Sequence, residues 1–593
     1  MTEISLRPLW VALGLLTIAA HLGLVFYGLV PNLVSRPLHM ALLLPWVFLL
    51  PANGRVQITI GLALTVVGVA CCLWIAFNHR ALRDQYGFLE SQAQVWMAVA
   101  LLALTIEGAR RAIGWPLPLV AAAMLAYGLW GQHLPGEFGH SGTPLRSFLG
   151  TLTIAEGGLW GSLTGVSVGV VAIFVIFGAT LNAGEAGRGF MNVAAAAAGR
   201  LKGGAAKVSV LSSALFGSIS GSASANVAST GAVTLPAMTR LGYPKRLSAA
   251  VEAVASSGGQ IMPPLMGAGA FVMVELTGVP YTQIMLAAVL PAFLYFLAVW
   301  VGINAWASRQ PLPGLPKDQR PSRRDVAVTS AFFLVPFTVL LWLMFVSGFT
   351  PQYAACVATF TGAGLLFFDG QRGFDARQGT RRLAETALGA GRQIAMIGSI
   401  ILCASIIIGV LGITGLGVKL TSVILSGSGG LLWPSLLLTA LACLLLGMEV
   451  PTTAAYVICV SVAGPALTQL GLSPLLAHLF VFWFALLSTI TPPVCGAVFI
   501  AAGMVGENWL KVAITAMALG VGLYVIPLGM VANPALIGLA DEPATAALAF
   551  GKMGLALTAL SWGLIGKASP LLRTILIAGS LAAVFLAPVA ITG

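Results

Sequence analysis

Uncharged apolar stretches recur along this chain from Leu9 to the C-terminus, and they constrain its fold more than any other feature. Only 8% of the 593 residues are charged, whereas an ordinary soluble protein carries about 25%. So few charges cannot cover a water-facing surface, so a soluble globular protein is excluded. One bilayer crossing takes about 20 helical residues, and the length allows roughly 14 to 17 crossings or half-crossings. We expect an all-α polytopic, multi-pass membrane protein.

The first apolar run, residues 9–30, is preceded by Arg7. It is longer than the core of about 7–15 residues in a signal peptide, and no small-residue cleavage site follows. We therefore expect an uncleaved first span. The polar, turn-rich segment 132–150 is the predicted domain boundary. The predicted domains are a membrane domain of four or five spans (1–131), a linker (132–150), the main domain (151–544) and two extra spans (545–593).

The net charge of +12 comes largely from short loops between apolar runs. Loops 308–325 and 369–392 are rich in arginine and are separated by two apolar runs, so they lie on one side of the membrane. The positive-inside rule makes that side cytoplasmic, which explains the charge better than nucleic-acid binding does. The seven cysteines all lie in apolar runs, without the spacing of a zinc site or a disulfide framework.

An internal repeat relates residues 208–272 to residues 437–501. The first copy holds a Gly-led turn, then Pro236-Ala237, then Pro263-Pro264 followed by Gly267-Ala268. The second copy has the same order at an offset of 229 to 230 residues, in Gly447, Pro465-Ala466, Pro492-Pro493 and Gly496-Ala497. The shared order and near-constant spacing indicate a duplicated structural unit.

Each copy begins with a segment that suits a re-entrant hairpin. Residues 208–239 contain no charge, and they are too many for one straight span and too few for two. The expected tip is the Gly- and Ser-rich stretch 217–226, and its counterpart lies near 447–453. Irregular backbone at membrane depth is tolerated only inside protein or beside water.

The two Pro-Pro pairs predict broken helices, because each proline removes a backbone donor and clashes with the preceding turn. The spans 246–277 and 474–505 are expected to unwind around Ser257–Pro264 and Ser488–Pro493. Free carbonyls and half-helix ends then bind ions and substrate near the membrane midplane, as in secondary transporters. The alternative is that the Gly-rich turns and Pro-Pro pairs only serve helix packing. Four such motifs at matching positions of two repeats make this the weaker interpretation.

The sequence gives little support for an ATP-driven pump or an enzyme. There is no G-x-x-x-x-G-K-[ST] string for an ATP-driven pump, and the six histidines are scattered without H-E-x-x-H. We find no nucleophile–base pair or metal cluster, so we do not expect an enzyme. His478 is expected to be packed or to reach an interface. Glu252 and Glu275 flank the first broken span, and each is either a functional intramembrane acid or a cap at an interface.

At these residues the sequence resembles the TRAP transporters, the tripartite family that depends on a periplasmic binding protein. The resemblance is carried by four segments within about 150–550, namely 213–238 (SALFGSISGSASANVASTGAVTLPAM), 252–281 (EAVASSGGQIMPPLMGAGAFVMVELTGVPY), 445–457 (LLGMEVPTTAAYV) and 488–503 (STITPPVCGAVFIAAG). More narrowly, the chain looks like the fused permease of the TAXI branch. Residues 1–131 resemble the small subunit in span count alone.

The resemblance implies an ion-transporter-like elevator fold with inverted repeats, two re-entrant hairpins and two broken helices. It implies a first cation site at Ser218, Ser220, Ser222, Asn226, Ser257, Gly258 and Pro263. It implies a second at Gly447, Glu449, Pro451, Thr452, Thr489, Thr491 and Pro492, and substrate contacts from Ser222, Ser224, Thr452 and Thr453. The family often has a small or apolar residue in place of Glu449, which puts pure sodium coupling in doubt.

The resemblance thus implies a permease of the bacterial inner membrane that imports an organic anion, a carboxylate, taken from a periplasmic TAXI-type binding protein. We expect no cofactor; Na⁺ is the expected coupling ion. Two alternatives remain: an H⁺-coupled version, and a stand-alone anion–cation symporter that needs no binding protein.

Overall fold

The computed structural model describes residues 3–52, 54–370, 373–447, 450–587 and 589. Their regular structure is almost entirely helical, with one small antiparallel sheet of β1 (Phe368–Asp369) and β2 (Gly373–Phe374). Eight described helices are long and apolar enough to cross a membrane, so the expected all-α polytopic membrane protein is confirmed. The described residues also form six shorter apolar helices of 10–17 residues, which explains why the chain length suggested more crossings than the long helices make.

The chain forms two compact units. The first contains Met1–Gly184 and Leu334–Ile424, and the second contains Glu185–Phe333 and Leu425–Gly593. Helices α16 (Arg323–Phe345) and α19 (Leu416–Gly427) run from one unit into the other.

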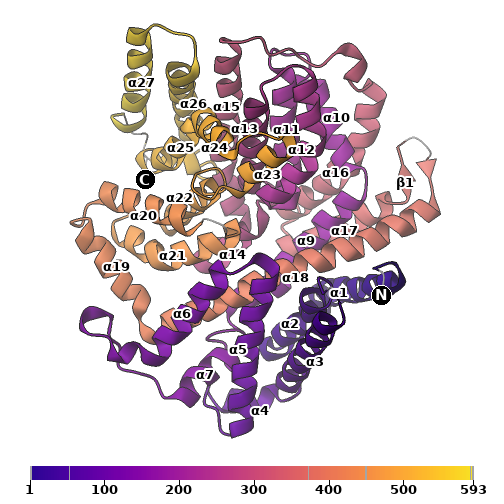
Figure 1. Cartoon of the computed structure of the whole chain (residues 1–593), viewed down its shortest axis with the longest axis vertical. Helices are drawn as coiled ribbons and strands as arrows, with labels where there is room; N and C mark the ends of the chain where they lie inside the picture. The colour runs from indigo at the N-terminus through magenta and orange to yellow at the C-terminus, as the bar shows by residue number, and fades with distance from the viewer. Residues whose placement is uncertain (1–2, 53, 371–372, 448–449, 588, 590–593) are drawn as a thin grey trace. The chain divides into compact units, whose positions relative to one another are not determined.

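The other elements of the first unit follow the chain in two stretches (Figure 1). They are α1 (Glu3–Tyr27), α2 (Asn32–Phe48), α3 (Arg55–Phe77), α4 (His79–Asp84), α5 (Gln92–Ile113), α6 (Pro116–Trp130), η1 (Gly131–His133), η2 (Gly136–Phe138), α7 (Leu145–Thr153), α8 (Ser162–Val166), the π-helical turn η3 (Ser167–Val171), α9 (Ala172–Ala183), α17 (Pro351–Leu365), β1, β2 and α18 (Ala376–Thr414).

The second unit contains both repeats. Its elements are α10 (Ala186–Ala198), α11 (Gly204–Ser220), α12 (Ala223–Arg240), α13 (Lys245–Gly258), η4 (Gly259–Ile261), α14 (Gly267–Thr277), α15 (Tyr281–Ala307), η5 (Lys317–Gln319), α20 (Leu432–Leu446), α21 (Thr452–Gln469), α22 (Pro474–Leu487), α23 (Gly496–Val505), α24 (Trp509–Leu519), α25 (Val521–Ala532), η6 (Pro534–Ile537), α26 (Pro543–Ile565) and α27 (Pro570–Phe585).

Helix starts follow ordinary capping chemistry. Ser91 and Gln94 form a capping box at the start of α5. Asp375 accepts bonds from the backbone N–H groups of Arg377 and Gln378, at 3.0 and 3.1 Å. This cap begins α18 at Ala376, so the expectation that all of 369–392 is a loop is wrong. Arg377, Arg381 and Arg382 lie on the first turns of this 39-residue helix, and Arg392 lies further along it.

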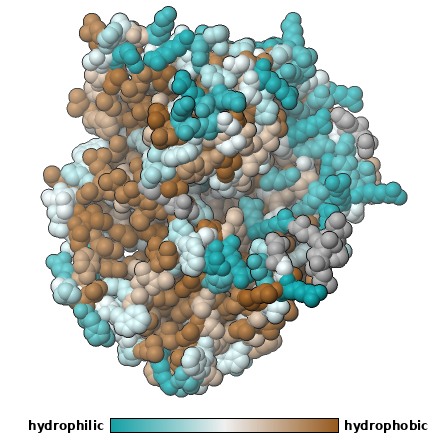
Figure 2. All heavy atoms as spheres, in the orientation of Figure 1, coloured by the Kyte–Doolittle hydropathy of each residue, from teal (hydrophilic) through white to brown (hydrophobic). Residues whose placement is uncertain are grey.

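Apolar side chains remain exposed on the helices, as lipid-facing surface requires. Leu62, Trp342 and Leu555 are examples from α3, α16 and α26. Figure 2 shows broad brown areas of apolar side chains on one face, with hydrophilic side chains gathered elsewhere on that face.

Candidate functional site

The first Pro-Pro helix is interrupted where the sequence predicts. Helix α13 ends at Gly258, the 3₁₀ turn η4 follows, and α14 begins at Gly267. Pro263 lies in the interruption and is half-buried. The peptide between Pro263 and Pro264 is cis, as is that between Pro492 and Pro493.

Glycines let the first hairpin approach this interruption closely. A Cβ added at Gly217 on α11 would lie 2.3 Å from the Cα of Gly259, a distance that atoms in contact cannot adopt. At the tip, a Cβ on Gly221 would lie 2.7 Å from the Cα of Gly267. Backbone therefore packs directly on backbone, which is one use of glycine that no other residue allows.

Asn226 links the hairpin to the interrupted helix. Its side chain is fully buried, and its Nδ2 donates to the carbonyl oxygens of Ser213 and Ser256, at 2.8 and 3.3 Å. One amide on α12 thus bridges α11 and α13. Of the predicted first-site residues, Asn226 is the one that holds the three helices together.

Two of the predicted serines at the first tip, Ser218 and Ser222, form local hydrogen bonds. Ser218 Oγ donates to the carbonyl of Leu215 at 2.7 Å, and Ser222 caps α12 by accepting from the N–H of Ala225 at 3.3 Å. Ser220 is buried near the end of α11, while Ser224 is exposed on the first turn of α12. The hydroxyl oxygens of Ser218 and Ser222 keep further acceptor capacity.

The second repeat has the same design. Helices α20 and α21 form its hairpin, and α22 stops at Leu487 before α23 begins at Gly496. Ser488 Oγ donates to the carbonyl of Gly447 at 3.1 Å, which ties the hairpin end to the interruption. Glu449, predicted for the second cation site, lies outside the described residues.

The other second-site residues surround this break. Pro451 precedes α21, and Thr452 is buried as the first residue of that helix, followed by the half-buried Thr453. Thr491 Oγ1 lies 2.6 Å from Tyr524 Oη of α25, a partner that the sequence did not suggest. Pro492 is half-buried beside it.

The two predicted cation sites meet at one contact. Ser257 Oγ of the first interruption lies 2.8 Å from Thr489 Oγ1 of the second. Each hydroxyl also has its own backbone acceptor, Ala253 O at 2.9 Å and Leu486 O at 2.8 Å. Either hydroxyl can donate to the other, so the two interrupted helices share one hydrogen bond between side chains.

The predicted substrate residues are carried by the two hairpins. Ser222 and Ser224 begin α12, and Thr452 and Thr453 begin α21. No hydrogen bond among the described residues joins the two pairs. Ser224 Oγ lies 3.8 Å from where a Cβ on Gly496 would stand, so the first pair does reach the second interrupted helix.

Glu252 lies at the centre of a cluster of hydroxyl groups. Its side chain is fully buried in the middle of α13, so its interpretation as an interface cap is wrong. Serine and threonine hydroxyls from α11, α12 and α13 donate to it, namely Ser209, Ser213, Thr230, Thr234 and Ser256. Glu275, by contrast, is exposed in the last turn of α14.

The sequence contains a signal that would have revealed this cluster. Ser209 with Ser213, Thr230 with Thr234, and Glu252 with Ser256 are each spaced i, i+4. That spacing places both members of a pair on one face of a helix. Three polar pairs on three apolar helices of one repeat predict one buried polar contact.

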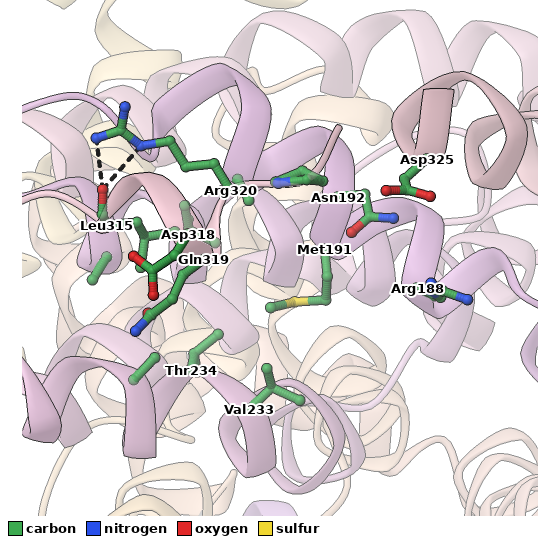
Figure 3. Close-up of a pocket in the computed structure, with 15 residues that line it drawn as sticks. Arg188, Met191, Asn192, Val233, Thr234, Leu315, Asp318, Gln319, Arg320 and Asp325 are labelled. Carbon is green, nitrogen blue, oxygen red and sulfur yellow. Dashed lines mark hydrogen bonds between the residues drawn. The ribbon is translucent and has the colours of Figure 1, made fainter. Parts of the chain in front are cut away.

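A cavity of about 420 Å³ lies on the same unit (Figure 3). Arg188, Asn192 and Thr234 line it from the helices, and Asp318 and Arg320 line it from the loop before α16. Tyr243 holds this loop by donating to the carbonyl of Pro313 at 2.6 Å. Burial raises the pKa of Tyr243 to about 12, so it stays a neutral donor at physiological pH.

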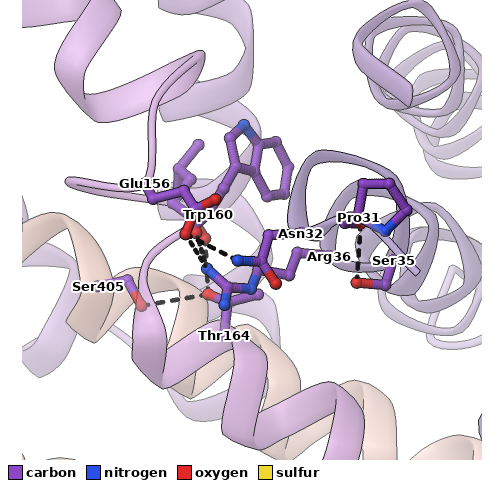
Figure 4. A network of polar contacts seen from close by, with 9 residues as sticks. Pro31, Asn32, Ser35, Arg36, Glu156, Trp160, Thr164 and Ser405 are labelled. Atoms are coloured by element: carbon purple, nitrogen blue, oxygen red, sulfur yellow. Dashed lines mark hydrogen bonds and ion pairs between the residues drawn. The ribbon is translucent and has the colours of Figure 1, made fainter. Parts of the chain in front are cut away.

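A separate polar network lies in the first unit (Figure 4). Arg36 of α2 donates to the carbonyl of Trp160 and lies 3.5 Å from Glu156, which also accepts from Asn32 at 2.8 Å. Thr164 and Ser405 extend the polar contacts to α18. This network binds the N-terminal helices to residues beyond 150.

Three of the histidines, His21, His39 and His478, are packed inside the protein. His21 and His39 are buried and share a hydrogen bond of 2.7 Å, and His39 lies 3.0 Å from Ser167 Oγ. His478 is hydrogen-bonded to Tyr456 Oη at 2.7 Å. Within the described residues no group of three His, Cys, Asp or Glu side chains forms a metal site.

The sequence matches a known family over most of its length. The family model described as "Tripartite ATP-independent periplasmic transporter, DctM component" matches residues 95–545, more than half of the chain. The chain is 26% identical over 342 residues to the C4-dicarboxylate TRAP transporter large permease protein DctM of Pseudomonas aeruginosa, covering 57% of this chain and 77% of that protein.

Two other relatives are matched over smaller shares of their length. The isethionate TRAP transporter permease protein DctMQ of Oleidesulfovibrio alaskensis is 24% identical over 370 residues, covering 62% of this chain and 57% of that protein. The C4-dicarboxylate TRAP transporter large permease protein DctM of Vibrio cholerae is 27% identical over 266 residues, covering 44% and 54%. All three names describe permeases. The chain therefore belongs to the family of the DctM component, the large permease of tripartite ATP-independent periplasmic transporters.

Proposed function

We propose that this protein is the permease of a binding-protein-dependent secondary transporter that imports an organic anion with a Na⁺ gradient, by an elevator movement. One observation carries the proposal: the hydroxyls of Ser257 and Thr489 meet where the interrupted helices of the two repeats come together. Helix interruptions in corresponding positions of two repeats are the usual site of ion and substrate binding in secondary transporters.

The first cation site is formed around Asn226, Ser257, Gly258 and Pro263, with the tip serines Ser218, Ser220 and Ser222. The second is formed around Gly447, Pro451, Thr452, Thr489, Thr491 and Pro492. Hydroxyl and carbonyl oxygens make up the described parts of both sites, and hard cations prefer such ligands.

The substrate is a carboxylate or a related organic acid. Ser222, Ser224, Thr452 and Thr453 lie on the first turns of α12 and α21, and helix N-termini favour anions. The relatives named for C4-dicarboxylates and isethionate support this class of substrate.

The partner is a periplasmic binding protein of the TAXI type, and the membrane is the bacterial inner membrane. Residues 1–131 take the place of the small subunit, 132–150 link them to 151–544, and 545–593 add further helices. The family match begins at residue 95, so the last helices of 1–131 also resemble the large subunit.

A second candidate is coupling to H⁺ in place of Na⁺. It is favoured by Glu252, a fully buried carboxyl group on the first interrupted helix. Intramembrane acids of this kind often serve as proton carriers.

The test is uptake into proteoliposomes that contain the purified chain. We expect accumulation of a labelled organic anion that requires both the cognate binding protein and an inward cation gradient. Separate Na⁺ and pH gradients distinguish the two couplings. Uptake that proceeds at full rate without the binding protein supports the stand-alone symporter and contradicts the proposal.

A further inference from the structure

The environment of the Glu252 carboxyl group is unusual for a buried acid. Oε1 lies within hydrogen-bond distance of Ser213, Thr230 and Ser256, and Oε2 within that of Ser209 and Thr234. All six side chains are buried. Hydroxyl groups thus surround both oxygens, and a charge in this position is isolated from water.

No described basic side chain neutralises this acid. The titratable groups on α13 and on the elements packed against it are Lys207, Arg240, Lys245, Arg246, Tyr281, Tyr295, His478 and Lys511. None of them forms an ion pair or hydrogen bond with Glu252 among the described contacts. A buried charge without a counter-charge is costly, which favours a bound proton for part of the transport cycle.

The hydroxyl groups suit both protonation states. Thr230 Oγ1 lies 2.8 Å from the carbonyl of Asn226, and Thr234 Oγ1 lies 3.0 Å from the carbonyl of Thr230. When Glu252 is ionised, these hydroxyls can donate to it. When it is protonated, they can turn to their backbone carbonyls and accept its O–H. Neither state leaves the carboxyl group without partners.

Thr234 connects the cluster to the cavity of Figure 3. Its side chain lines that cavity and donates to Oε2 of Glu252. The cavity is also lined by Asp318 and Arg320, which belong to the loop that the positive-inside rule places in the cytoplasm. Thr234 therefore lies between the buried acid and this cavity.

The second repeat lacks this chemistry. In the register of the two Pro-Pro pairs, Val481 corresponds to Glu252 and Ala485 to Ser256. Both are fully buried. The architecture of an interrupted helix therefore does not need an acid here, so packing alone does not explain Glu252.

We propose that Glu252 is a proton-binding site of the transport cycle, exchanging its proton with the cytoplasmic cavity through Thr234. Thr234 gives its hydroxyl proton to Oε2 and takes one from water in the cavity, and release runs in reverse. This inference rests on the proposed function as a transporter, and it adds a proton to the cycle whether or not Na⁺ also moves.

The test compares Glu252→Gln with Glu275→Gln in proteoliposomes supplied with the binding protein. Glutamine resembles a permanently protonated carboxyl, so Glu252→Gln should keep exchange of labelled for unlabelled substrate but lose accumulation driven by a pH gradient. Glu275→Gln makes the same chemical change at an exposed site and should keep both. Normal pH-driven accumulation by Glu252→Gln overturns the proposal.

A spectroscopic measurement decides the question independently of transport. Infrared difference spectra of the wild type between acid and alkaline pH should contain, beside the bands of the exposed acids, one carbonyl band of a buried protonated carboxyl that is absent from Glu252→Gln and present in Glu275→Gln. If Glu252→Gln does not fold, Thr234→Val replaces it and should shift the pH midpoint of that band. If the wild type lacks this band, or if Thr234→Val leaves its pH midpoint unchanged, the proton site is contradicted. If the wild type shows no uptake that depends on the binding protein, only the proposed function is contradicted.

Discussion

The side-chain oxygens of Ser257 and Thr489 lie 2.8 Å apart, joining the interrupted helix of one repeat to that of the other. The two residues are 232 positions apart in the chain. A displacement of one hydroxyl therefore breaks a contact between the two repeats, and under the proposed function this contact couples cation binding to both of them.

Alanine substitution at this contact should weaken cation dependence. Ser257→Ala and Thr489→Ala should each raise the Na⁺ concentration needed for half-maximal uptake, because each removes an oxygen from the site. The double variant should be less impaired than the sum, with a coupling energy of about 0.5–3 kcal/mol. Ser405→Ala is a matched control, since Ser405 also pairs with a buried hydroxyl, Thr164 at 3.3 Å. If the effects of the two single substitutions simply add in the double variant, the two hydroxyls do not belong to one cation site.

Substitution at the glycine contact should destabilise the first hairpin. Gly217→Ala places a methyl group 2.3 Å from the Cα of Gly259, and such overpacking costs about 1–3 kcal/mol. We expect a lower melting temperature in detergent and reduced transport. Gly503→Ala on α23 is the control, because a Cβ there meets no atom within 4 Å. Equal melting temperatures for the two variants would contradict the close packing.

Asn226 is predicted to act through its two donated hydrogen bonds. Asn226→Asp keeps the shape but turns an acceptor toward the carbonyls of Ser213 and Ser256. Leaving buried groups unsatisfied costs about 1–3 kcal/mol, and more when one is charged. Thermal unfolding should show this loss, while Asn182→Asp, at an exposed site on α9, should be neutral. A stable Asn226→Asp protein would refute the bridging role.

In the first unit, Arg36 should matter more than its acidic partner. The Glu156 side chain is 54% exposed, and exposed ion pairs contribute about 0–1 kcal/mol. Arg36 also donates to the buried carbonyl of Trp160, so Arg36→Ala should lower the melting temperature clearly more than Glu156→Gln. Equal losses would mean that the ion pair, and not the carbonyl bond, carries the interaction.

The sequence predicted the interruptions well because their cause is local. Adjacent prolines cannot continue a helix. The first helix ends at Gly258, inside the predicted segment 257–264, and the second ends at Leu487, one residue before the predicted segment 488–493. Glycine and serine at the hairpin tips are equally local signals. Because the second copy repeats the order of the first at a nearly constant offset, a feature predicted in one copy could be predicted in the other.

The contacts between the repeats could not be predicted in the same way. The pairing of Ser257 with Thr489 and of Thr491 with Tyr524 depends on how separate helices pack. Glu252 was identified as a candidate without its partners, because each of its hydroxyl donors is unremarkable when read singly. The start of α18 was misjudged because charges suggested a loop, although arginine is a good helix former.

The most direct test of the central claim is a cryo-EM map of the chain in lipid nanodiscs with Na⁺, resolving both the helices and the bilayer boundaries. The account predicts that α13–α14 and α22–α23 are interrupted near the middle of the bilayer, with density for a cation beside Ser257 and Thr489. Interruptions that lie at the bilayer surface, or continuous helices facing the lipid, would contradict it.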